Sequence, residues 1–306
     1  MQISRRTFAA GSAAVLAGAA APHASARAVG SPADIAASQA AWRRRPTSRV
    51  TLGSALPQAH AHNDYEHPRP LLDALTHGFT SVEADVWLVD GDLRVAHDPW
   101  ELDGAPTLRE AYLEPLARLA SPNGKQILPD HSGPFQLLID IKSDGEQTWP
   151  VIEAQLAEHD RIVTRVRDGR VRRRAVQAVI SGDRPREAML AARTRRSFFD
   201  GRPEDLASGL PTSFMPLVSA NWTSMFTWHG LGQMPAFERR RLDDYVGQAH
   251  AAGYRVRFWA TNDLPGRMRE NLWTTLAEAG VDHINTDDLA GLRAFLTGRG
   301  RAVTGS

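Results

Sequence analysis

The sequence of 306 residues contains no cysteine. It therefore has no disulfide and no cysteine that could carry a lipid, so its stability must come from the packing of its core. It also has no basic tract with interleaved aromatic residues, and its formal net charge is +1. We therefore expect no nucleic-acid partner.

Residues 1–26 are predicted to be an export signal. Arg5 and Arg6 precede an apolar run of Ala, Gly, Leu and Val, and residues 24–26 (Ala-Ser-Ala) suit a cleavage site. The adjacent arginines resemble a twin-arginine signal, so we expect a secreted or periplasmic protein with a flexible leader over residues 27–50. An N-terminal membrane anchor is the alternative, but the run is too short and alanine-rich to span a hydrocarbon core of about 30 Å.

Apolar segments of strand length alternate with helical patterns along the rest of the chain. Eight strands are predicted, over residues 56–62, 79–89, 135–142, 175–183, 196–200, 213–221, 254–262 and 281–288. This order predicts an α/β fold, a single-domain TIM (β/α)₈ barrel over residues 51–300 with an insertion around 99–134. A doubly wound open sheet is the alternative, but no G-x-G-x-x-G motif follows an early strand.

One segment outside this pattern is rich in arginine. Residues 161–174 alternate apolar side chains with Arg, and Asp168-Gly169 interrupts the alternation. The pattern predicts an exposed β-hairpin with a solvated face. A surface that meets anionic lipid headgroups is the less favoured interpretation.

Polar side chains gather at the predicted C-terminal ends of the strands, which line the active site in a TIM barrel. Each lies within or just after an apolar run, where a polar group needs partners to offset the loss of water. These residues are His60, His62, Asn63, Glu83, Asp85, His97, Asp140, Lys142, Ser181, Asp183, Asn221, Thr261, Asn262 and Asp287.

Three of these residues carry carboxylates that can share a cation. Glu83 and Asp85 are two residues apart on one strand, so both side chains point to the same face, and Asp140 ends the next barrel strand. Carboxylate oxygens around one point fit Ca²⁺ or Mg²⁺, whereas a salt bridge to an arginine is the alternative. His62 and His97 flank this group and could act as an acid/base pair near neutral pH.

The motifs HND, EAD, VAHD, IDIK, WATN and GVDHINTDD resemble those of the glycerophosphodiester phosphodiesterase and phosphatidylinositol-specific phospholipase C superfamily. The resemblance covers residue 58 to about residue 290. It implies a TIM barrel with His62 and His97 as catalytic residues and Lys142 in contact with the phosphate. It also implies Glu83, Asp85 and Asp140 as metal ligands. The His62-Asn63 pair is similar to one in the phospholipase C branch, which implies Asn63 as a fourth ligand.

Two departures from the glycerophosphodiesterase pattern affect the site. That family usually carries H-R-G where this chain has His62-Asn63-Asp64, so the arginine that assists the phosphate is missing. It also usually carries Glu at the position of Asp140. The chain is therefore expected to be a metal-dependent phosphoric diester hydrolase acting on a glycerophosphodiester or phospholipid headgroup, while the substrate itself does not transfer with the motif.

Several further residues are expected to contact substrate. They are His60, Asp183, Asn221, Trp222, Trp259 and Asn262. Trp222 could form an apolar wall with Phe226 and Trp228, or these rings could simply pack in a loop. Asp287 could orient a ligand or cap the last helix.

Two rival functions remain open. His60-x-His62 also matches the H-x-H motif of zinc amidohydrolase-type barrels, although the middle strands offer no further histidine ligand. A catalytically silent exported binding module is the second rival. We expect a monomer whose partner is a small phosphodiester or phospholipid, with at most transient contact with a membrane surface.

Overall fold

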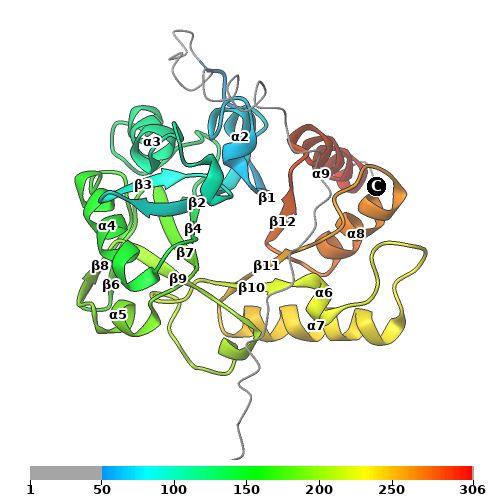
Figure 1. Cartoon of the computed structure of the whole chain (residues 1–306). Helices are drawn as coiled ribbons and strands as arrows, with labels where there is room; N and C mark the ends of the chain where they lie inside the picture. Colours follow the sequence, from blue (N-terminus) through cyan, green and yellow to red (C-terminus); the bar gives the residue numbers. More distant parts are fainter. Residues whose placement is uncertain (1–49, 305–306) are drawn as a thin grey trace, which may run out of the picture.

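The computed structural model describes residues 50–304, so the predicted signal over residues 1–26 and nearly all of the predicted leader lie outside the described residues. Eight parallel strands form a closed barrel, because β1 pairs with both β2 and β12. The predicted TIM barrel is confirmed (Figure 1). The barrel strands are β1 (Leu56–Ala61), β2 (Phe79–Val89), β4 (Phe135–Ile141), β7 (Val176–Gly182), β9 (Ser197–Gly201), β10 (Leu217–Asn221), β11 (Arg255–Trp259) and β12 (His283–Thr286).

Helices surround the barrel (Figure 1). They are α2 (Leu72–Thr76), α3 (Glu114–Leu119), α4 (Gly145–Glu158), α5 (Arg186–Ala191), α6 (Trp222–Met225), α7 (Ala236–Ala251), α8 (Arg267–Glu278) and α9 (Leu289–Thr304). Side-chain caps fix where some of them begin: Asp144 accepts from the main-chain N–H of Gln147, as a helix N-cap does. In the described part of the chain, no helix combines the length and the apolar character that crossing a membrane requires.

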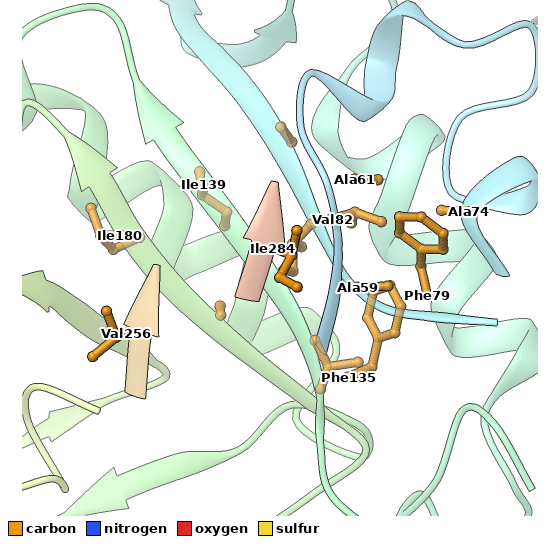
Figure 2. Close-up of a cluster of buried hydrophobic side chains, with 14 of the residues drawn as sticks. Ala59, Ala61, Ala74, Phe79, Val82, Phe135, Ile139, Ile180, Val256 and Ile284 are labelled. Carbon is orange, nitrogen blue, oxygen red and sulfur yellow. The ribbon is translucent and has the colours of Figure 1, made fainter. Parts of the chain in front are cut away.

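The barrel strands separate apolar from polar side chains by simple alternation. Val82 on β2 and Ile139 on β4 belong to the large apolar cluster that also includes Ala74 of α2 (Figure 2). The intervening residues of β2 are Ser81, Glu83 and Asp85, which are all buried. Since successive side chains of a strand point to opposite faces, the apolar set packs against the helices while the polar set faces the barrel interior.

The segment between the second and third barrel strands begins with a hairpin. β3 (Asp92–Val95) pairs antiparallel with β2 around Asp90 and Gly91, both of which have positive φ as a two-residue hairpin turn requires. The remainder, in the region predicted as an insertion, holds η2 (Pro99–Glu101), a π-helical turn η3 (Arg109–Leu113) and α3. Two further short 3₁₀ turns are η1 (Asp64–Glu66) and η4 (Pro203–Asp205).

The predicted arginine hairpin is confirmed and belongs to a small separate sheet. β5 (Arg165–Arg167) and β6 (Arg170–Arg172) pair antiparallel, and β8 (Thr194–Arg195), which was not predicted, adds a third strand. These strands precede β7 and β9 in the chain, so the sheet lies at the N-terminal end of the barrel, away from the strand ends that carry the polar residues. Val166 closes this end by packing against a second apolar cluster made of Leu138, Val179, Phe198 and Leu217.

Candidate active site

Three carboxylates meet at the C-terminal end of the barrel. Asp85 on β2 and Asp140 on β4 are direct register partners, and Glu83 lies one pleat deeper on the same face of β2. One oxygen from each carboxylate lies within 4.8 Å of the others. Among the described residues, this is the group of side chains arranged to hold a metal ion.

Two cations partly neutralise this cluster. The Arg257 guanidinium, buried on β11, donates from Nη2 to Glu83 Oε2, and Lys142 Nζ lies 3.1 Å from Asp85 Oδ2 and 3.2 Å from Asp140 Oδ1. Burial alone raises the pKa of Glu83, but Arg257 and the neighbouring histidines hold it well below its usual range. Burial and the charge of Asp85 instead raise the pKa of Asp140 to about 6. Three carboxylates thus face two cations, and negative charge remains uncompensated.

The donor set fits a hard divalent cation. Asp85 Oδ1 is buried and has no hydrogen-bond partner, which is costly for a carboxylate oxygen unless a cation accompanies it. All the available ligand atoms are oxygens, as Ca²⁺ and Mg²⁺ prefer. Asn63 has a left-handed backbone (φ 45°, ψ 42°), and its Oδ1 accepts from the Tyr65 hydroxyl at 3.0 Å. That hydroxyl also bonds Asp85, so the Asn63 side chain lies beside the cluster.

His62 is held by a carboxylate from the last barrel strand. Its Nδ1 lies 2.9 Å from Asp287 Oδ1, and Asp287 in turn is fixed by its main-chain N–H, which donates to Asp263 Oδ2 at 2.7 Å. Burial lowers the pKa of His62, but the charges of Glu83 and Asp287 outweigh it and raise the pKa. The carboxylate that accepts from the main-chain N–H of Gly291 in α9 is that of Asp288, so this capping contact belongs to Asp288 and not to Asp287. Orientation of a ligand by Asp287 stays a prediction.

His97 is also held by a carboxylate, that of Asp85. Its Nδ1 lies 3.1 Å from Asp85 Oδ2, and this hydrogen bond raises the pKa of His97 despite partial burial. Tyr65, which the sequence analysis missed, donates its hydroxyl to Asp85 Oδ2 at 2.6 Å and lies 3.1 Å from His97 Nδ1. Tyr65 therefore links Asn63, Asp85 and His97 in one hydrogen-bonded group.

His60 lies buried beneath the site. Its side chain is fully buried, with Nδ1 2.7 Å from Ser81 Oγ and Nε2 3.4 Å from Glu83 Oε2. Burial and Arg257 lower the pKa of His60 to about 4, so the ring is neutral. Its assignment as a substrate-binding residue stays a prediction, one that the full burial of the ring does not favour. The zinc alternative is also weakened, because neither His60 nor His62 joins a metal-binding group among residues 50–304.

Trp222 is likewise a core residue. It has no exposed surface, packs against Phe226 and Phe258, and donates its indole N–H to the main-chain oxygen of Trp228. Asn221 caps the short helix α6 by accepting from the N–H of Thr223, and the helix carries Trp222 inward. This burial favours the alternative that the Trp222 ring simply packs, and contact with substrate stays a prediction.

Of the other residues predicted to bind substrate, Asp183 and Asn262 lie on loops of the catalytic face, and Trp259 ends β11. Asp183 accepts from the main-chain N–H of Gly145 at 2.9 Å and so joins the end of β7 to the start of α4. Asn262 bridges two loops, since it bonds the main chain of His229 and Leu264. Trp259 is half-buried at the end of β11. Asp183 and Asn262 have structural roles whether or not they also touch a ligand.

The sequence contained only weak indications that Arg257 and Tyr65 belong to the site. Arg257 stands within the apolar strand segment YRVRFW, where a charged side chain signals a buried partner, and Tyr65 follows directly on the HND motif. Nothing in either segment identifies Glu83 or Asp85 as that partner.

The closed barrel, the carboxylate cluster and the two carboxylate-bound histidines define a class of enzyme. The model described as "AIM6-like phosphodiesterase domain" matches residues 52–200, and the model "Glycerophosphoryl diester phosphodiesterase family" matches residues 255–290. The chain is a member of the glycerophosphodiester phosphodiesterase and phospholipase C-like phosphodiesterase superfamily. Within that superfamily it belongs to the family of altered inheritance of mitochondria protein 6, as its relatives show.

Two curated relatives support this placement. The altered inheritance of mitochondria protein 6 homolog of Arthroderma benhamiae is 31% identical over 278 residues, covering 82% of this chain and 87% of that protein. The altered inheritance of mitochondria protein 6 of Eremothecium gossypii is 32% identical over 274 residues, covering 78% of this chain and 69% of that protein. A solved glycerophosphoryl diester phosphodiesterase from Parabacteroides distasonis has a TM-score of 0.46 and 14% identity, covering 86% of this chain and 92% of that one.

Proposed function

We propose that the protein hydrolyses a glycerophosphodiester or a phospholipid headgroup by acid/base catalysis with His62 and His97. One observation carries the proposal: each ring is bound through Nδ1 to a carboxylate, and one of these carboxylates, Asp85, belongs to the metal-binding cluster. No hydrogen bond within residues 50–304 engages the Nε2 atom of either ring. A histidine fixed in this way presents one nitrogen to a ligand in a defined orientation.

The cofactor we propose is a single Ca²⁺ or Mg²⁺ ion held by Glu83, Asp85 and Asp140, with Asn63 as an additional ligand. Such an ion, when bound, polarises a phosphoryl oxygen and lowers the pKa of a neighbouring hydroxyl or water. The uncompensated negative charge of the cluster and the partnerless Asp85 Oδ1 support this choice.

The remaining steps belong to the protein's own side chains. One histidine accepts the proton of the attacking hydroxyl or water, and the other donates a proton to the leaving alcohol. Asp287 holds the His62 ring, while Asp85 and Tyr65 hold the His97 ring. Lys142, whose pKa is raised above its usual value because Asp85 and Asp140 outweigh the effect of burial, offers a permanent positive charge to the phosphate.

The proposal is tested with the purified protein and a panel of glycerophosphocholine, glycerophosphoinositol, lysophospholipids and phosphatidylinositol, with and without Ca²⁺ and Mg²⁺. His62→Ala and His97→Ala should each abolish hydrolysis, since acid/base catalysis contributes about 10²–10⁴-fold in rate. EDTA should abolish the activity of the wild type.

His159→Ala is the matched control, because that ring bonds only the main-chain oxygen of Gln155 in α4, and it should retain full activity. Undiminished hydrolysis by either active-site variant would refute the assignment. A wild type with no activity on the whole panel would favour the silent binding module.

We further propose that the protein is exported through its twin-arginine segment and acts as a monomer. The support for export is the sequence of residues 1–26, with Arg5 and Arg6 preceding a short apolar run. Replacing both arginines by lysine should leave the protein in the cytoplasm, as measured by cell fractionation. Export that is unaffected by this double substitution would contradict the proposal.

A further inference from the structure

Two arginines form a cationic wall on the catalytic face beside the carboxylate cluster. Arg184 follows the end of β7 and Arg202 follows the end of β9, and these strands are paired in parallel (Figure 1). Arg202 donates from Nη1 to Asp200 Oδ2 at 2.8 Å and from Nη2 to Ser181 Oγ at 3.1 Å. The single carboxylate of Asp200 is fully buried and paired with Arg202.

Arg184 has no such carboxylate. Its Nη1 donates to the main-chain oxygen of Asp200, its guanidinium lies 4.8 Å from the centre of the Phe199 ring, and its Nε is buried with no hydrogen-bond partner. Within residues 50–304, no carboxylate forms an ion pair with it. Burial and the nearby charge of Arg202 lower the pKa of Arg184, an effect that more distant carboxylates only partly offset. A half-buried guanidinium in this situation is stabilised by an additional anion.

This wall lies next to the carboxylate cluster and Lys142, where the scissile phosphodiester is proposed to bind. Asp85, Asp140 and Ser181 are register partners on three neighbouring strands, and Arg202 bonds Ser181. The charge of Asp140 also raises the pKa of Arg202, which places the two side chains in one electrostatic neighbourhood. Neighbouring strands are about 4.8 Å apart, so the end of β7 lies about 5 Å and the end of β9 about 10 Å from the end of β4. A ligand whose phosphodiester lies at Lys142 and Asp140 needs to extend over that distance to meet both arginines.

We propose that Arg184, supported by Arg202, forms a second anion subsite that binds a negatively charged group on the alcohol of the scissile phosphodiester. The inference rests on the proposed function and narrows its substrate class to phosphodiesters that carry a second anion. Guanidinium groups suit phosphate and carboxylate because they donate two parallel hydrogen bonds. A cationic headgroup such as choline is disfavoured beside two arginines.

The test compares two substrates that differ by one phosphate, glycerophosphoinositol and glycerophosphoinositol 4-phosphate. The wild type should prefer the phosphorylated substrate in kcat/KM, and Arg184→Met should reduce that preference by about 10- to 100-fold, mainly through KM. Arg184→Lys should restore part of it. Arg186→Met is the matched control, because Arg186 is already paired with Asp205 at 2.7 Å, and it should keep the preference of the wild type.

A binding measurement tests the subsite without requiring hydrolysis. Calorimetry with inositol 1-phosphate and inositol 1,4-bisphosphate, in the presence of Mg²⁺, should show tighter binding of the bisphosphate by the wild type and not by Arg184→Met. A thermal melt checks that Arg184→Met is folded. Equal binding of both ligands by the wild type, or a preference that survives in Arg184→Met, overturns the subsite. Absent hydrolysis with the expected binding difference overturns the phosphodiesterase proposal and leaves the subsite in place.

Discussion

At the scale of single residues, the site is organised around pairs in which a carboxylate fixes a histidine. Asp287 holds His62, and Asp85 holds His97. Asp287 does not belong to the group of carboxylates arranged to hold a metal ion, and its side chain is hydrogen-bonded to His62. This makes Asp287 a positioning residue, which can be tested separately from the cluster.

Asp287→Asn should lower kcat by about 10²-fold, because the amide orients the ring less strongly and removes the charge that favours protonated His62. In the pH profile of kcat/KM, the part that reports the ionisation of His62 should disappear or shift along the pH axis. KM should change little. Asp288→Asn is the control: it alters the neighbouring carboxylate, which caps α9, and should cost stability but not kcat. Equal kcat in Asp287→Asn and the wild type would remove Asp287 from the site.

At the scale of elements, the loop between β1 and α2 is held in a strained conformation. Leu71 has φ 61° and ψ −50°, and the N–H of Leu72 donates to the oxygen of Pro70 at 2.6 Å, which makes a tight three-residue turn. Such a backbone costs about 1–3 kcal/mol and needs support from its surroundings. Asp64 supplies it, since its Oδ2 accepts from the N–H of Leu71 and from the hydroxyl of Tyr112. This loop begins at His62, directly after β1, so the strained turn and His62 belong to one connection.

Tyr112→Phe should therefore destabilise the protein by about 1–2 kcal/mol, because it removes a donor from the buried Asp64 carboxylate. Urea unfolding measures the loss. Tyr245→Phe is the matched control, since the hydroxyl of Tyr245 is buried with no hydrogen-bond partner and its removal should cost nothing. If both variants unfold at the same urea concentration as the wild type, Asp64 does not anchor the loop through Tyr112.

At the scale of the whole molecule, charge is distributed unevenly between the two ends of the barrel. Residues 161–174 hold seven arginines and one aspartate, in a chain whose formal net charge is +1. Arg167, Arg170, Arg172 and Arg173 are exposed there. Since this sheet lies at the N-terminal end of the barrel, contact through it would leave the catalytic face directed away from the contacted surface.

Any binding to anionic phospholipid vesicles should therefore depend on this sheet and not on catalysis. Replacing Arg170, Arg172 and Arg173 together by Glu should abolish co-sedimentation with vesicles at low salt, because electrostatic attraction to the headgroups is lost. Hydrolysis of a soluble substrate should be unchanged. Vesicle binding that persists in the triple variant would assign the contact to another surface.

The local features of this molecule were predictable, and the features that depend on distant strands were not. All eight barrel strands and the Glu83, Asp85 and Asp140 cluster follow from alternation and short motifs. The contact of Arg257 with Glu83 joins residues 174 apart in the chain, and no local pattern specifies which strands face each other across a barrel. The full burial of Trp222 was not predictable either, because a tryptophan after a strand resembles a loop residue, whereas α6 turns it into the core.

The position of Lys142 between two carboxylates has a practical consequence. The chain has two lysines, Lys125 and Lys142, and acylating reagents attack only the unprotonated amine. Asp85 and Asp140 keep the amine of Lys142 protonated, while Lys125 is exposed on the loop that precedes β4. An amine-reactive dye or resin should thus attach at Lys125 in preference to Lys142. A protein attached through Lys125 would be held by the N-terminal end of its barrel, with the strand ends that carry the carboxylate cluster open to solution.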